Sequence, residues 1–72
     1  MSIKIGDKVK TIGFYKGITG VVTDVVPGFD VENHGFIDIQ VIKADPKHNL
    51  APGDIDNFVH FNWEKAMKVI KE

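Results

Sequence analysis

GDKVKTIGFYKGITGVVTDV, residues 6–25, has the clearest structural pattern in this chain. Two runs, residues 8–12 and 18–26, are rich in Val, Ile and Thr, the residue types that favour β-strands. Glycines lie between and beside these runs, and glycine permits the positive φ that tight turns require. We therefore expect a β-hairpin that opens a small β-barrel. The glycines expected at the turn are Gly13, Gly17 and Gly20.

The rest of the chain also has strand patterns. Alternating apolar and polar residues indicate a third strand at residues 36–43, with its apolar side chains on one face. A fourth strand is expected at residues 55–61 and a fifth at residues 67–70. Segments rich in Pro, Gly, Asn and Asp, at residues 27–35 and 45–54, are typical of the loops that separate strands.

The segment just before the last strand has two interpretations. We expect a single turn of 3₁₀ helix at residues 62–66. The alternative is a helix over residues 62–71, because its apolar residues follow the three-four spacing of a helix. The turn is preferred, since strands fill the chain before this point.

Five short strands with a turn before the last are typical of an all-β, SH3-like barrel. Closing the sheet into a barrel removes the exposed strand edges that a flat sheet presents. We expect the first and last strands to pair, which places Val9 near Val69. The predicted core comprises Val9, Ile18, Val21, Val25, Ile37, Ile39, Val41, Phe58 or Val59, Phe61, Met67 and Val69.

Length and composition narrow the class of protein. A chain of 72 residues is expected to form a single domain over residues 1–72. Because the chain has no Cys, disulfides, thiolate metal sites and thiol nucleophiles are excluded. No apolar run reaches the roughly 18 residues of a membrane span, and residues 1–6 lack the apolar region of a signal peptide. We expect a cytoplasmic protein with no membrane partner.

Charge is unevenly distributed along the chain. The net charge is −1, and every basic residue is Lys. Residues 1–20 hold four lysines and one acid, whereas residues 21–38 hold four acids and no basic residue. Bidentate recognition of guanine or phosphate is characteristic of Arg. The acidic net charge and the absence of Arg therefore favour a protein partner over sequence-specific nucleic-acid binding.

Three elements of residues 6–25 resemble the KOW motif. They are Gly6-Asp7-Lys8-Val9, then Lys16-Gly17, then Gly20-Val21. KOW domains occur in ribosomal proteins and transcription elongation factors, where loops at one end of the barrel contact RNA or protein. The resemblance implies that the loop of residues 13–17 is a contact surface, with Tyr15 and Lys16 at its tip.

A second likeness is to the SH3-like photosystem I subunit PsaE. The chain is similar to that family in length, in an early Gly-x-x-Val, in a Gly-x-Val strand and in Asn57-Phe58 near the last strands. The basic and aromatic signature of that family is mostly missing here. Its function is therefore not carried over.

The first hairpin loop is the main candidate binding site. An exposed aromatic side chain can stack on a nucleic-acid base or on an apolar side chain of a partner. The candidate residues are Phe14, Tyr15 and Lys16, with Lys8 and Lys10 nearby. In the alternative interpretation, Phe14 turns inward to close the end of the barrel and Tyr15 covers it.

Two further aromatic residues are candidate partner contacts. Phe29 lies in the acidic loop of residues 28–35, where it would anchor a basic partner; the simpler interpretation is a solvated hairpin loop. Trp63 is the only Trp and is interpreted either as a lid on the core or as an aromatic side chain in a peptide-binding groove.

The chain lacks an arrangement typical of catalysis or metal binding. His34, His48 and His60 have no metal-ligand spacing, and Asp54 falls in a turn rather than beside Asp56 on a strand. We predict no enzymatic activity, no metal, no cofactor and no small-molecule substrate. The predicted function is a small binding or adaptor module that docks a protein partner through the first hairpin loop. The alternative is RNA or ribonucleoprotein binding through the same loop.

Overall fold

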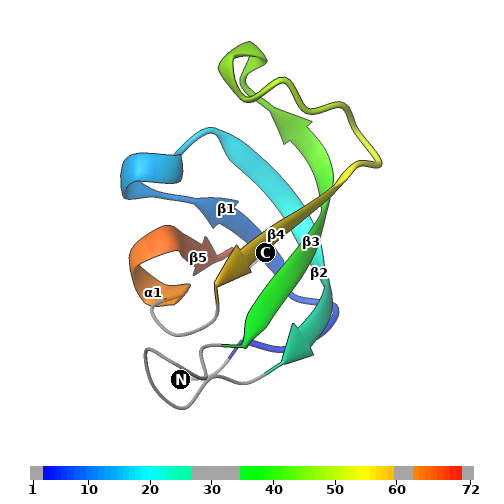
Figure 1. Ribbon diagram of the computed structural model, residues 1–72, viewed down its shortest axis with the longest axis vertical. Coiled ribbons are helices and arrows are strands. Elements are labelled where there is room, and N and C mark those ends of the chain that lie inside the picture. The colour runs from blue at the N-terminus through cyan, green and yellow to red at the C-terminus, as the bar shows by residue number, and fades with distance from the viewer. Residues whose placement is uncertain (1–2, 27–34, 60–62, 71–72) are drawn as a thin grey trace.

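The chain folds into one antiparallel sheet, seen in the computed structural model in Figure 1. The structure describes residues 3–26, 35–59 and 63–70, without the side chains of Phe14, Val59, Trp63 and Glu64. The spatial order of the strands is β4-β3-β2-β1-β5. Their bounds are β1 (Lys8–Thr11), β2 (Ile18–Val26), β3 (Phe36–Ala44), β4 (Ile55–Val59) and β5 (Met67–Val69).

The pairing of the first and last strands is confirmed. Val9 in β1 lies opposite Val69 in β5. The all-β class is confirmed as well, with five antiparallel strands in one curved sheet. The sheet is not closed, because in the described residues β4 and β5 are its two edges and do not pair with each other.

Three short helical segments connect the strands. They are η1 (Gly13–Tyr15) and η2 (Pro46–His48), both 3₁₀, and α1 (Trp63–Ala66). The turn before β5 is therefore α-helical rather than 3₁₀. The longer helix over residues 62–71 is wrong, because Met67–Val69 pairs with β1 instead.

The position of α1 follows from its contacts with the edges of the sheet. It contacts both β4 and β5, and it also packs beside η1. The C-terminal end of α1 is hydrogen-bonded to the residue that follows β1, because the backbone N–H of Ile12 donates to the carbonyl oxygen of Ala66 at 2.8 Å. The segment between the two sheet edges therefore also supports the first hairpin loop.

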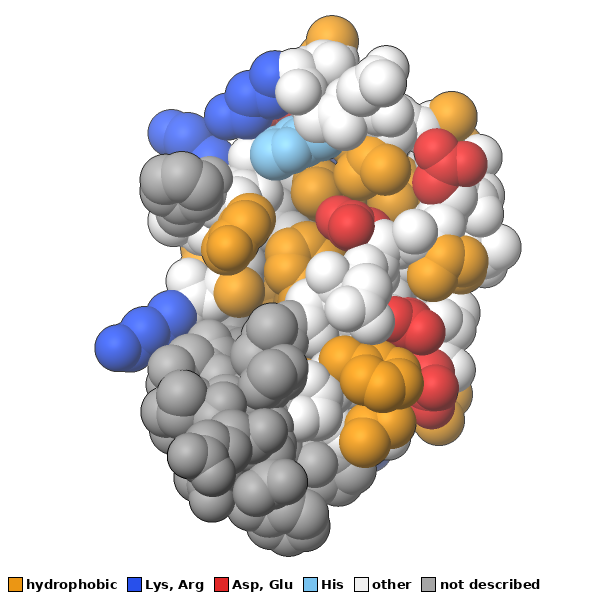
Figure 2. Space-filling view, viewed as in Figure 1, with side chains coloured by type: hydrophobic (Ala, Val, Ile, Leu, Met, Phe, Trp, Pro, Cys, Tyr) orange, Lys and Arg blue, Asp and Glu red, His pale blue; other side chains and the backbone are white. Residues whose placement is uncertain are grey.

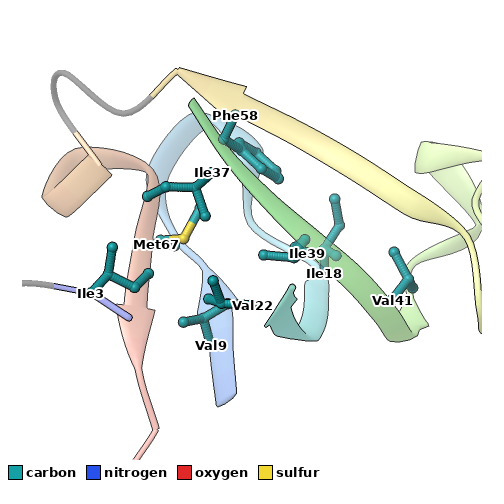
Figure 3. Packing of buried hydrophobic residues seen from close by; sticks show 9 residues of the cluster. All are labelled: Ile3, Val9, Ile18, Val22, Ile37, Ile39, Val41, Phe58 and Met67. Carbon is teal, nitrogen blue, oxygen red and sulfur yellow. The ribbon is translucent and has the colours of Figure 1, made fainter. Parts of the chain in front are cut away.

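The core lies against the concave face of the sheet (Figure 3). Of the two alternatives Phe58 and Val59, Phe58 is in the core. Phe61, also predicted in the core, lies outside the described residues. Val25 and Val69 are only partly buried at its border. The buried apolar residues are Ile3, Val9, Ile18, Val22, Ile37, Ile39, Val41, Phe58 and Met67.

One core assignment from the sequence is wrong. Val22, 1 % exposed, is in the core, and Val21 is only half-buried. The strand register explains why Val22 rather than Val21 is in the core: Val21 lies opposite Lys8, and directly opposed residues point to the same face, here the outer one. The alternation then runs Ile18, Gly20 and Val22 on the inner face.

Gly20 is not at the hairpin tip; it lies within β2, where β2 and β3 approach closely. A methyl group at Gly20 would lie 2.6 Å from the carbonyl oxygen of Gln40. The ladder register shifts at this point, so that Gly20 faces Val41 while Thr19 faces Lys43. Ile42 is the extra residue of this β-bulge and is 44 % exposed.

Candidate functional site

The loop between β1 and β2, residues 12–17, is hydrogen-bonded to the buried hydroxyl of Thr11. Thr11 is 4 % exposed and lies at the end of β1. Its Oγ1 donates to the carbonyl oxygen of Tyr15 and accepts from the backbone N–H of Ile18 at 3.0 Å. One side chain therefore satisfies a backbone carbonyl within the loop and the backbone N–H just after it, which fixes the loop's conformation.

The same loop is held from the side by η2. The backbone N–H of Asp45 donates to the carbonyl oxygen of Gly17 at 2.8 Å, and Nε2 of His48 lies 2.8 Å from the carbonyl oxygen of Lys16. Gly17 has φ +114, and a methyl group there would lie 2.6 Å from Oδ2 of Asp45. The positive φ favours glycine at this position, as its place at the turn predicted, and a larger residue would also have to displace the exposed side chain of Asp45.

Tyr15 is held at this loop in a half-exposed position. Its ring makes an edge-to-face contact with Phe58, with 5.7 Å between centroids and 89° between the planes. Tyr15 nevertheless remains 49 % exposed. The ring of Tyr15 therefore covers part of the core and also presents surface to solvent.

The predicted lysines are on the surface, but they do not all surround the loop. Lys16 is exposed at the end of η1. Lys8 and Lys10 alternate with buried Val9 and Thr11, so they lie on the outer face of the sheet. Figure 2 shows lysine side chains gathered at the upper left, at the end of the molecule where η1 and η2 lie in Figure 1.

Three of the predicted contact residues are not placed by the structure. Phe29 lies outside the described residues, and so do the side chains of Phe14 and Trp63. The backbone of Phe14 belongs to η1 and that of Trp63 to α1, and these two elements pack together. The first hairpin loop and α1 are therefore neighbours.

The register reveals a row of lysines that the sequence alone did not indicate. Lys10 lies opposite Lys68 in β5 and opposite Thr19 in β2, and Thr19 lies opposite Lys43 in β3. All three lysines are exposed. We call Lys68, Lys10, Thr19 and Lys43 the lysine row. It crosses four strands, so its members are far apart in the sequence, and only the strand register could have identified it.

A groove of about 300 Å³ runs beside the lysine row. Lys10, Thr19 and Lys43 of the row line it, together with Gly17 and Asp45. The groove therefore carries two lysines and one carboxylate.

His48, Asp54 and Asp56 have local structural roles. His48 supports the hairpin loop, and Oδ2 of Asp54 accepts from the backbone N–H of Ala51 at 2.9 Å, which confirms the predicted turn. Oδ1 of Asp56 accepts from the next backbone N–H, that of Asn57. Among the described residues, no three His, Cys, Asp or Glu side chains are grouped to hold a metal ion. His34 and His60 lie outside those residues.

Comparisons with protein-family models, curated proteins and solved structures find no match for this chain. In the part of the chain that the structure describes, no helix is long and apolar enough to cross a membrane.

Proposed function

We propose that the protein is a small, non-catalytic binding module that docks a protein partner through the first hairpin loop. Its contact residues are Tyr15 and Lys16 in the loop, with Lys8 and Lys10 on the adjoining strand. We further propose that the curved sheet is an SH3-like barrel whose gap between β4 and β5 is filled by α1, which contacts both edges.

The observation that carries the proposal is that a half-exposed aromatic residue lies on a fixed loop. Thr11 and His48 bind the backbone of the loop from two directions. Tyr15 has its ring oriented by Phe58 and is still 49 % exposed. A rigid aromatic side chain loses little conformational entropy on binding, which is why such residues are favoured at protein interfaces.

The charge pattern favours a protein over RNA. Lysine is the only basic residue type, and the net charge is −1. RNA binding through the phosphate backbone requires a strong excess of positive charge, because its affinity comes mainly from counterion release. RNA contact by Tyr15 and Lys16 remains the second candidate, since an exposed ring beside lysines is also what stacking on single-stranded bases uses.

The test is capture of a partner from native lysate by the tagged chain, with and without nuclease. We expect a protein that is retained after nuclease treatment and is lost with the double variant Tyr15→Ala/Lys16→Ala. Lys65→Ala is the matched control, because Lys65 is an exposed lysine on α1 outside the proposed contact residues. Retention of nucleic acid alone, with loss of all protein after nuclease, would support RNA binding instead.

A further inference from the structure

We propose that the lysine row binds an acidic, extended segment of a protein partner, which lies across the strands on the outer face of the sheet. This inference rests on the proposed docking function and adds the chemistry of the partner. It adds Lys43 and Lys68 to the proposed contact residues, and both lie outside the hairpin loop.

The first argument is the unfavourable placement of the charges. Lys10 and Lys68 lie directly opposite each other on neighbouring strands, and both are exposed. Like charges in directly opposed positions repel and destabilise a sheet. An anionic ligand bound between them converts this repulsion into attraction, so the arrangement suits an acidic partner better than it suits the isolated fold.

The second argument is the β-bulge that aligns Lys43. In a regular ladder Val41 faces Gly20, so the next residue, Ile42, would face Thr19. The register shift skips Ile42 and brings Lys43 opposite Thr19 on the outer face. Bulges commonly re-aim a side chain, and here the result is a third lysine in line with two others.

The dimensions of the row fit a short extended peptide. Neighbouring strands lie about 4.8 Å apart, so the backbone span from Lys43 to Lys68 is about 14 Å. Alternate residues of an extended chain repeat at about 6.6 Å, so three acids at alternate positions cover about 13 Å. The hydroxyl of Thr19, between Lys10 and Lys43 in the groove, can donate one further hydrogen bond.

The rest of the outer face argues for a short segment rather than a long polyanion. Asp24 lies opposite Asp38 on this face, at the other end of β2 and β3. Asp45 lines the groove itself, so a peptide bound along the row lies beside this carboxylate. A long nucleic acid that crosses the face would also meet Asp24 and Asp38, which a peptide confined to the row avoids. The absence of Arg points the same way.

The test uses a fluorescein-labelled peptide with Glu at three alternate positions, separated by Ser, and fluorescence anisotropy with the full chain. A second peptide with Gln in place of Glu is the ligand control. We expect Lys43→Gln and Lys68→Gln each to weaken binding about two- to fivefold, as expected for single exposed ion pairs. Lys65→Gln should leave the affinity unchanged. Binding should weaken from 50 to 300 mM salt, because exposed charges are screened.

The outcomes separate this inference from the proposed function. If the Glu peptide fails to bind at low salt, or binds no better than the Gln peptide, the inference is wrong. It is also wrong if the Lys43→Gln and Lys68→Gln variants bind the Glu peptide as tightly as the unchanged chain does. If Tyr15→Ala/Lys16→Ala still abolishes partner capture in that case, the proposed docking through the hairpin loop is supported without the lysine row. Tighter binding of a mixed-sequence RNA oligonucleotide than of the Glu peptide would overturn the choice of a protein. Peptide binding that depends on the row, with partner capture insensitive to Tyr15→Ala/Lys16→Ala, would support the row and refute the hairpin loop.

Discussion

Nε2 of His48 lies 2.8 Å from the carbonyl oxygen of Lys16, and this contact joins two loops that are 32 residues apart in the chain. Because a carbonyl oxygen only accepts, Nε2 must carry the proton and donate it. The contact fixes the exposed end of the hairpin loop, where Lys16 lies.

His48→Ala should loosen the hairpin loop. The lost hydrogen bond is expected to lower the free energy of unfolding by about 0.5–1.5 kcal/mol and to weaken partner binding as the loop becomes less ordered. Urea unfolding followed by circular dichroism measures the first effect. Lys47→Ala is the control, since Lys47 is an exposed residue of the same turn. Equal stability of the two variants would contradict a structural role for the His48 contact.

Thr11→Val should be strongly destabilising although the two side chains have similar shapes. It removes the hydroxyl that serves Tyr15 and Ile18, leaving backbone groups at a buried position without a partner. We expect a loss of about 1–3 kcal/mol in the free energy of unfolding. Thr23→Val is the matched control, because the Thr23 hydroxyl is exposed and makes only a 3.4 Å contact; its effect should stay within about 0.5 kcal/mol.

Gly17→Ala should cost more stability than Gly53→Ala. Both glycines have positive φ, +114 and +96, so both variants strain the backbone. A methyl group at Gly17 would also displace the exposed side chain of Asp45 and lie 3.1 Å from Nε2 of His48, while nothing lies within 4 Å of the corresponding position at Gly53. The difference between the two midpoints of thermal unfolding therefore measures the cost of moving these two side chains. A larger loss at Gly53 would show that the two loops are not packed as described.

Lys68→Gln should stabilise the isolated chain while weakening its binding to the acidic peptide. Removing one member of an opposed like-charged pair is expected to raise the free energy of unfolding by about 0.2–1 kcal/mol. The gain should shrink as salt is added, because the charges are exposed. Urea titrations at 20 and 300 mM salt check both statements, with Lys65→Gln as the control. A destabilised variant would mean that Lys68 makes favourable contacts in the free protein.

Much of the fold could be predicted from the sequence because the strands alternate regularly. The burial of Val9 between two outward lysines of β1 follows from that alternation. The pairing of Val9 with Val69 follows from the SH3-like layout, in which the first and last strands are neighbours. The choice between Val21 and Val22 failed because both are apolar, and the inward neighbour that fixes the register is Gly20, which has no side chain to reveal its orientation. Closure of the barrel is predicted from the number and layout of the strands, and these do not determine whether the edge strands pair.

The candidate site was less predictable. Tyr15 and Lys16 were recognised from the loop itself, because turn residues next to one another in sequence stay together in space. The contribution of His48 to that loop depends on a contact between distant segments, which no local pattern encodes. Lys43 and Lys68 likewise become neighbours of Lys10 only through the register of three separate strand pairs.

In a strand, the number of residues normally determines which face each side chain points to, and the bulge at Ile42 removes this dependence. In a regular strand, one inserted residue turns every following side chain to the opposite face. Here the extra residue is absorbed where it occurs, so Val41 remains in the core and Lys43 remains on the outer face. The number of residues in β3 is therefore not tied to the chemistry of either face. A homologue with one residue fewer at this position can keep both the same core and the same charged surface.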